Sequence, residues 1–218
     1  MPQFDPDTPN LARMYDYLLG GKDNFAVDRE ALDRLADLIP EAVPLARAAR
    51  GFLQRAVRYA AAQGVDQFLD VGSGLPTQGN VHEVVPEARV VYVDHDPVVV
   101  AHGRMLLGDQ DRAAMVEADL LDPARMLDEA ARWLDPARPV GVLLVSVLPF
   151  VPDSEDPHAV VGWLREALAP GSHLAIAHAT SPGESPAGGT GRGPEEIQRF
   201  FGDFRMIEPG LVQAHEWR

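Results

Sequence analysis

The feature that most constrains the fold of this chain is a glycine turn that directly follows a short apolar run. The run covers residues 66–71, and Gly72 and Gly74 come immediately after it. A second apolar run, 89–94, ends on Asp94, twenty residues beyond Gly74. In doubly wound α/β sheets, a glycine turn after one strand and a carboxylate after the next together hold a nucleoside. The pattern therefore predicts an α/β fold that binds a nucleoside.

Apolar runs alternate with helical patterns from residue 65 onward. We expect five parallel strands at 66–71, 89–94, 114–118, 140–147 and 172–179. Helices should follow at 79–85, 97–107, 122–134, 157–168 and 194–201. Strand–helix alternation favours a parallel sheet that is covered on both faces. Residues 204–208 and 211–216, joined by Pro209-Gly210, predict an antiparallel hairpin at the sheet edge, which would bring the sheet to seven strands. The segment 181–193 is rich in Gly, Pro and Ser and should form a mobile loop.

The first 64 residues have a helical pattern. Asn10 is placed to cap a helix that Gly20-Gly21 would end, and further helices are expected at 28–38 and 41–63. We therefore expect a single domain over 1–218, in which 1–64 form a helical N-terminal extension and 65–218 a Rossmann-like core.

Composition narrows the possible partners. The 218 residues carry 19 basic and 33 acidic side chains, a formal charge of −14, so the surface should repel nucleic acid. Arg47, Arg50, Arg55 and Arg58 share one predicted helix, and a solvated helical face explains them better than a basic patch. No apolar run is long enough to span a membrane, and no secretory signal is recognisable, so we expect a cytoplasmic protein. Seven histidines without ligand spacing, and no cysteine, predict no metal site.

Details of the glycine turn indicate which nucleoside it binds. A dinucleotide fingerprint requires a third glycine, where this chain has Thr77, and Pro76 removes one backbone N–H from the turn. Asp70, two residues before Gly72, would place a negative charge close to a pyrophosphate. Its position suits a cationic ligand that carries amino and carboxylate groups, so a nicotinamide-dependent oxidoreductase is disfavoured.

The pattern Asp70-x-Gly72-x-Gly74 resembles the first motif of class I S-adenosylmethionine-dependent methyltransferases. Segments 12–25, 75–83, 92–97 and 208–212 are similar to the signatures of an actinobacterial methyltransferase family, formerly a domain of unknown function. The resemblance covers nearly the whole chain. It implies a class I methyltransferase-like, mostly parallel doubly wound sheet, S-adenosyl-L-methionine as cofactor, and an unidentified small-molecule substrate. Members usually carry a helix between Thr180 and Gly193, where this chain has a short link, so either the lid is reduced or residues are missing there.

The resemblance also implies the residues that contact the cofactor. Asp94 would accept hydrogen bonds from the two ribose hydroxyls, and Asp119 would contact the adenine amino group unless it only forms a turn. Asp96 fits better as the N-cap of the helix that starts at Pro97. The complete expected set is Asp70, Gly72, Ser73, Gly74, Asp94, His95, Asp119, Leu120, Ser146, Tyr17, Asn24 and Phe25.

Methyl transfer from a sulfonium mainly requires alignment of donor and acceptor, and a base is needed only if the acceptor must lose a proton. Candidates for that base are Tyr15, Asp16, His82 and His178. Each has a structural alternative: helix packing and surface charge for Tyr15 and Asp16, capping for His82, and a satisfied histidine at a strand end for His178. A methyltransferase acting on a small molecule is the leading hypothesis. The alternative is a protein that binds S-adenosylmethionine or S-adenosylhomocysteine without transferase activity, as a regulator or sensor.

Overall fold

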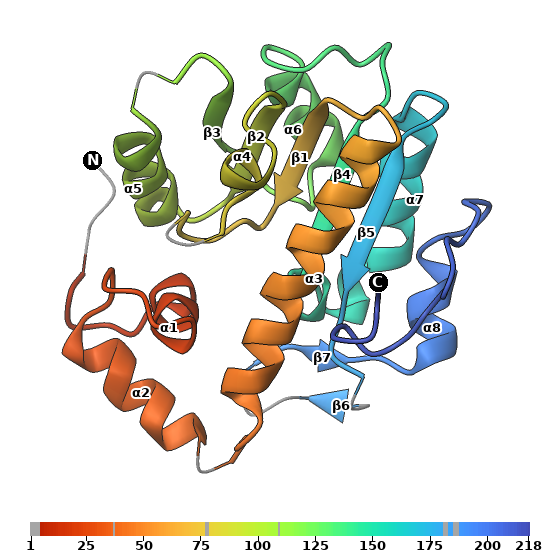
Figure 1. Ribbon diagram of the computed structural model, residues 1–218. Helices are drawn as coiled ribbons and strands as arrows, with labels where there is room; N and C mark the ends of the chain where they lie inside the picture. The colour runs from red at the N-terminus through yellow and green to blue at the C-terminus, as the bar shows by residue number, and fades with distance from the viewer. Residues whose placement is uncertain (1–4, 37, 77–78, 109, 181–182, 185–187) are drawn as a thin grey trace.

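A five-stranded parallel sheet forms the centre of the protein (Figure 1). The computed structural model describes residues 5–36, 38–76, 79–108, 110–180, 183–184 and 188–218. The strands are β1 (Gln67–Val71), β2 (Arg89–Asp94), β3 (Ala113–Glu117), β4 (Gly141–Val145) and β5 (His173–Ala177), in the order β3-β2-β1-β4-β5. All five predicted strands are confirmed within two residues at each end. The strand order reverses between β1 and β4, and in open α/β sheets ligands bind at the carboxyl edge beside such a reversal.

Helices cover both faces of the sheet. One face carries α3 (Ala42–Ala62), α4 (Val81–Val84) and α5 (Pro97–Leu107), and the other carries α6 (Pro123–Ala130), α7 (Pro157–Ala167) and α8 (Pro194–Arg199). Successive side chains of a strand point to opposite faces. Phe68 therefore packs with Val57 of α3, whereas Leu69 packs with Met126 and Leu164 on the opposite face. None of the helices in the described ranges is long and apolar enough to cross a membrane.

Three of the crossover helices begin with the same dipeptide, Asp-Pro. Asp96 caps α5 by accepting a hydrogen bond from the Val98 N–H at 2.8 Å, which confirms the capping role predicted for it. Asp122 and Asp156 cap α6 and α7 in the same way. Proline suits the first helical position because its fixed φ is already helical and its missing N–H would have no helical partner. Short polar caps thus fix where each helix leaves the carboxyl edge.

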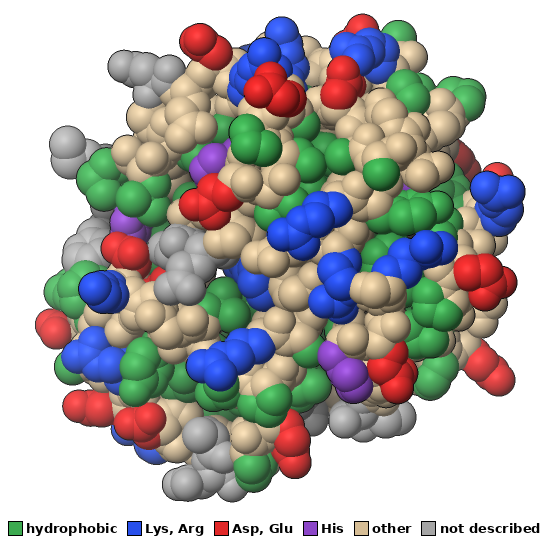
Figure 2. Space-filling model, viewed as in Figure 1, with side chains coloured by type: hydrophobic (Ala, Val, Ile, Leu, Met, Phe, Trp, Pro, Cys, Tyr) green, Lys and Arg blue, Asp and Glu red, His purple; other side chains and the backbone are tan. Residues whose placement is uncertain are grey.

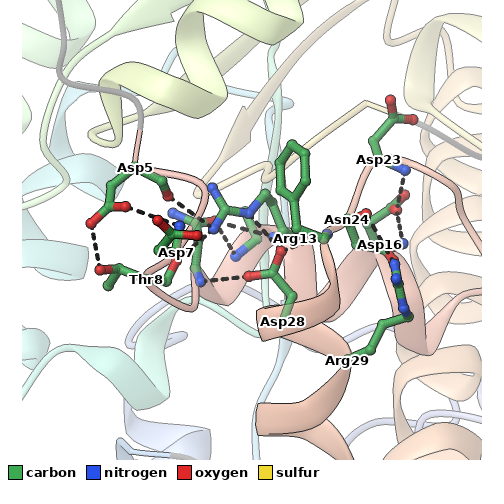
Figure 3. Close-up of polar contacts among 12 residues, drawn as sticks. Asp5, Asp7, Thr8, Arg13, Asp16, Asp23, Asn24, Asp28 and Arg29 are labelled. Carbon is green, nitrogen blue, oxygen red and sulfur yellow. Dashed lines mark hydrogen bonds and ion pairs between the residues drawn. The ribbon is translucent and has the colours of Figure 1, made fainter.

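Two N-terminal helices, α1 (Leu11–Leu18) and α2 (Ala26–Ala36), lie beyond the carboxyl ends of the strands (Figure 1). Asn10 caps α1, as predicted. The buried Arg13 side chain joins the two helices, because its Nε donates to Asp28 Oδ2 at 2.7 Å (Figure 3). Asp28 also accepts backbone hydrogen bonds from Asn10 and Phe25. Burial disfavours the charged carboxylate, but these hydrogen bonds, led by that from Arg13, hold the pKa of Asp28 below its usual value.

The predicted seven-stranded sheet and C-terminal hairpin are wrong. The parallel sheet has five strands, and residues 204–216 form turns and irregular backbone. Their backbone is held by a side chain instead of a strand partner. Arg55 of α3 donates to the carbonyl oxygens of Ala214 and Trp217, at 2.5 and 2.6 Å, and the Trp217 ring packs edge-on against Phe52. No residue of this tail is fully buried, so it lacks the buried face that a sheet strand would provide.

A short antiparallel pair forms within the segment predicted as a loop. β6 (Gly183–Glu184) pairs with β7 (Thr190–Gly191), and 181–182 and 185–187 of the predicted loop lie outside the described residues. Two 3-10 turns, η1 (Leu148–Phe150) and η2 (Asp153–Glu155), follow β4. Within the described part of this link, β7 contacts η1, which follows β4.

Replacement of Trp217 by alanine tests the contacts of the tail. Trp217 contacts Phe52 and Tyr59, with ring centroids 5.4 and 5.9 Å apart, so W217A should lower the free energy of unfolding by about 2 kcal/mol. Trp163 of α7 is 42% exposed, so W163A should cost less than about 1 kcal/mol and serves as the matched control. Urea unfolding measures both. Equal losses in the two variants would show that the tail does not contribute as described.

Candidate functional site

Both glycines of the turn after β1 adopt positive φ, 66° at Gly72 and 63° at Gly74. They differ in their surroundings. A Cβ on Gly72 would lie 2.3 Å from the Val147 side chain, so a residue that follows β4 occupies that space. A Cβ on Gly74 would have Ala12 of α1, at 3.9 Å, as its nearest neighbour. The structure therefore explains Gly72 by packing at the strand reversal, whereas Gly74 has room on its α1 side. Thr77, the third position of the motif, lies outside the described residues.

The carboxylate of Asp94 holds the turn in place. Its Oδ2 accepts a hydrogen bond from the Gly74 N–H at 3.0 Å, and its Oδ1 accepts one from the Asp96 N–H at 3.0 Å. Asp94 is buried, and burial raises its pKa, although these two hydrogen bonds oppose the rise. The structure thus brings Asp94 to the glycine turn, as predicted. The adjacent His95 side chain is 78% exposed, with Nδ1 4.0 Å from Asp94 Oδ1.

Helix α1 is attached to the same edge of the sheet. The Asn10 side-chain amide donates a hydrogen bond to Asp96 Oδ2, so the residue that caps α1 also binds the residue that caps α5. Farther along, Asp23 forms an ion pair with His102 of α5 at 3.3 Å. These contacts place α1 over the glycine turn, with Ala12 facing Gly74.

Arg50 of α3 faces Tyr15 of α1, and its charge acts on Asp70. Asp70 is buried at the end of β1, and burial raises the pKa of its carboxyl group to about 7, with the Arg50 charge opposing the rise and Asp94 adding to it. The Arg50 guanidinium lies 5.8 Å from the centre of the Tyr15 ring. Burial raises the pKa of Tyr15, whose hydroxyl donates to the Ala46 carbonyl at 3.3 Å.

The solvated face predicted for the arginines of α3 holds only in part. Arg47 and Arg58 are exposed, whereas Arg50 and Arg55 are half-buried and Arg55 binds the C-terminal tail.

A cavity of about 290 Å³ opens between α1 and α3. Its walls are made by Leu19, Arg47, Arg50, Gly51, Gln54 and Gly79. On the face drawn in Figure 2, basic side chains follow the course of α3 and the surface is hollowed between α1 and α3. A second cavity, of about 330 Å³, lies between α5 and β3, and neither cavity is lined by a predicted site residue.

Asp16 and Asn24 bind the loop that follows α1. The Asp16 carboxylate accepts hydrogen bonds from the Asp23 N–H and from the Asn24 amide, at 2.8 and 2.9 Å (Figure 3). A Cβ at Gly21 would lie 1.9 Å from Asp16 Oδ1, so glycine is required there. The Asn24 oxygen accepts from Arg29 at 2.9 Å. These two candidates therefore shape the loop.

The two aromatic candidates near α1 lie in different surroundings. Tyr17 is half-buried on α1. Phe25 is 40% exposed, and the Arg13 guanidinium lies 5.0 Å from the centre of its ring. Both rings therefore belong to the N-terminal segment that contacts the carboxyl edge.

His82 uses its Nδ1 in a structural hydrogen bond. The hydroxyl of buried Tyr92 accepts from the His82 backbone N–H at 3.0 Å and lies 2.7 Å from His82 Nδ1. Because a buried phenol needs an acceptor for its own proton, Nδ1 accepts that proton and the imidazole proton resides on Nε2. Burial lowers the pKa of His82, which agrees with a neutral ring.

His178 is bound by a residue that sequence analysis missed. Arg192 is buried and donates to the carbonyl oxygens of Leu148 and Val151 and to Asp153. Its Nη1 also lies 3.0 Å from His178 Nε2, and because a guanidinium only donates, that nitrogen must accept. The other ring nitrogen, Nδ1, then donates to the Ala179 carbonyl at 2.8 Å. In the sequence, the one feature that marks Arg192 is its place between Gly191 and Gly193, in the link between β5 and α8.

The remaining predicted residues follow β3 and β4. Asp119 is exposed, and its Oδ1 accepts from the Leu121 N–H at 2.9 Å, which is the turn-forming alternative considered for it. Leu120 is buried in the core. Ser146 has a φ of 62°, in the left-handed region that non-glycine residues seldom adopt, and its N–H donates to the Ala177 carbonyl at 2.9 Å. All three residues lie at the carboxyl edge of the sheet.

The neutral state of His178 makes stability depend on pH. Burial lowers its pKa first of all, and the Arg192 charge adds to this. The unfolded chain therefore binds a proton more readily, so stability should fall as pH drops through the ordinary histidine pKa of about 6.5. Urea unfolding between pH 7.5 and 5 should show a smaller loss in H178Q than in the native protein. Burial also lowers the pKa values of His82, His158 and His173, so part of the loss should remain.

H95Q supplies the control for this experiment, because it replaces a histidine whose side chain lies at the surface. A native slope in H178Q would contradict the assignment of His178 as a neutral hydrogen-bond acceptor.

Comparison with known proteins shows the family to which the chain belongs. The family model described as S-adenosyl methyltransferase matches residues 1–218. A candidate methyltransferase from Thermobifida fusca YX is 43% identical, with a TM-score of 0.90 over 97% of this chain and 86% of that one. A DUF574 family protein from Streptomyces avermitilis MA-4680 is 37% identical, with a TM-score of 0.89 over 98% of this chain and 90% of that one. No curated protein matches the chain significantly. The chain belongs to the S-adenosyl methyltransferase family, so it is a methyltransferase whose cofactor is S-adenosyl-L-methionine.

Proposed function

We propose that this protein methylates a small molecule in the cytoplasm, as a methyltransferase of the actinobacterial type that its N-terminal signature resembles. The observation that carries the proposal is the hydrogen bond between Asp94 and the Gly74 N–H, which joins the ends of β1 and β2 beside the strand reversal. We further propose that residues 1–218 act as one domain, with 1–64 covering the edge of the core. The formal charge of −14 favours a neutral or cationic acceptor over a nucleic acid.

The residues at the carboxyl edge fit S-adenosylmethionine. When bound, this cofactor supplies a methyl group activated by a sulfonium. Each carboxylate oxygen of Asp94 accepts one backbone hydrogen bond, so each has a further lone pair that can accept from a ribose hydroxyl. Asp70 provides a buried carboxyl group for the ammonium group. The backbone at Gly72, Ser73 and Gly74 would lie along the methionine part.

The other proposed contacts come from neighbouring elements. Asp119 and Leu120, after β3, would border the adenine, and His95 would lie at the exposed rim of the ribose site. Ser146, after β4, would border the methyl group. Tyr17, Asn24 and Phe25 would close the site from the α1 side, with Asn24 acting through the loop that it binds.

Alignment, and not a general base, is the proposed source of catalysis. His82 Nδ1 and His178 Nε2 accept structural hydrogen bonds, and Asp16 accepts two hydrogen bonds from its own loop. Tyr15 has a raised pKa and donates its proton to Ala46, so it is poorly suited to accept another. We therefore propose that the site positions the acceptor and excludes water, and that the acceptor attacks the methyl group directly.

Replacement of Asp94 tests the cofactor site. D94A should weaken binding of S-adenosylhomocysteine about 100-fold or more, because two hydrogen bonds to a charged group are lost and the turn loses its anchor. Isothermal titration calorimetry measures this. D128A removes an exposed carboxylate on α6 and should leave affinity unchanged. Undiminished affinity in D94A would overturn the site assignment, and transfer of a labelled methyl group to a panel of small acceptors would test the activity itself.

A further inference from the structure

The wall of the cavity between α1 and α3 contains a buried, charged hydrogen-bond donor that has no acceptor in the described part of the chain. Arg50 lines this cavity, and its Nε–H is buried without a hydrogen-bond partner among the residues that the structure describes. A buried donor without a partner costs free energy, and a charged donor costs more than a neutral one. A ligand group that accepts from Arg50 would remove this cost.

The other three arginines of α3 differ from Arg50. Arg55 donates to two carbonyl oxygens of the C-terminal tail. Arg58 is exposed and does not line the cavity, and Arg47 lines it but is exposed, so water can satisfy both. Among the four, Arg50 combines partial burial, an unpartnered N–H and a place in the cavity wall.

A buried carboxyl group lies on the same side of the sheet edge as Arg50. The Arg50 guanidinium faces Tyr15 of α1, with 5.8 Å to the ring centre, and Ala12 of the same helix faces Gly74 in the turn that follows Asp70. Asp70 is buried at the end of β1, and the Arg50 charge opposes the rise in its pKa. A guanidinium and a carboxyl group on one side of the site match the two charges of an α-amino acid.

We propose that Arg50 binds the α-carboxylate of the cofactor's methionine part, from the cavity between α1 and α3, while Asp70 faces the ammonium group. This inference rests on the proposed function, because it assigns one further binding residue at the same site. Arg50 is a binding residue that takes no part in methyl transfer. The guanidinium presents several N–H donors in a plane, so it recognises a carboxylate better than a lysine would.

A pair of ligands tests the proposal. S-adenosylhomocysteine contains the amino-acid group, whereas 5′-methylthioadenosine keeps the adenosine and lacks that group. In calorimetric titrations, R50Q should weaken binding of S-adenosylhomocysteine about 10- to 100-fold and change that of 5′-methylthioadenosine less than about 2-fold. R50K, which keeps the charge but not the planar donors, should fall between R50Q and the native protein. R58Q removes an exposed arginine of the same helix that does not line the cavity, so it is the matched control and should retain native affinity for both ligands.

Each other outcome overturns the proposal. If R50Q and R50K bind S-adenosylhomocysteine as tightly as the native protein, Arg50 does not bind the carboxylate, although the proposed function stands. If both ligands weaken equally in R50Q and R50K, Arg50 acts on the structure of the site. Thermal unfolding without ligand checks that the variants are folded. If the native protein binds neither ligand, the proposed function itself fails, and D94A then has no affinity to lose.

Discussion

The carboxylate of Asp94 is the contact on which the arrangement of the carboxyl edge depends. One oxygen holds the Gly74 N–H after β1, and the other holds the Asp96 N–H, from which α5 begins. Asp96 in turn accepts from Asn10, which caps α1. Three elements far apart in the sequence thus meet through two neighbouring aspartates. Because the buried carboxylate is costly to charge, its hydrogen bonds must be retained, and this rigidity suits a group that is also proposed to bind ribose.

Local signals explain which parts of the fold could be predicted. The five strands, the Asn10 cap and the Asp96-Pro97 helix start depend on residues adjacent in the sequence, and all are confirmed. The C-terminal hairpin was wrong because the conformation of the tail depends on Arg55, 162 residues before Trp217. Side-chain pairing across such a distance leaves no periodicity in the sequence. For the same reason, Arg192 was missed and Arg50 was assigned to a solvated helical face. Asp94 could be placed because each strand of a parallel sheet ends at the same edge.

Polar contacts also decide between the alternatives that the sequence left open. His82 and His178 both follow strands or turns that open toward the carboxyl edge, and their positions alone were compatible with acid–base roles. Their partners, the Tyr92 hydroxyl and the Arg192 guanidinium, fix the proton on the opposite ring nitrogen in each case. In each ring the nitrogen that lacks a proton already accepts a hydrogen bond, so the histidine cannot take up a proton without losing that bond and becoming charged in a partly buried site. A histidine that lies at the carboxyl edge is therefore not necessarily able to act as a base.

The net charge of the proposed cofactor contacts affects the donor and the product differently. With both carboxyl groups ionised, Asp70, Asp94 and Arg50 together contribute one net negative charge. S-adenosylmethionine carries one net positive charge, from its sulfonium and ammonium groups less its carboxylate, and S-adenosylhomocysteine carries none. The site would therefore attract the donor more strongly than the product, since opposite charges attract most where burial excludes water. The raised pKa of Asp70 adds to this difference, because a carboxyl group that titrates near pH 7 ionises more completely beside the donor's extra positive charge. The groups that are proposed to hold the donor would thus bind the product more weakly and favour its release.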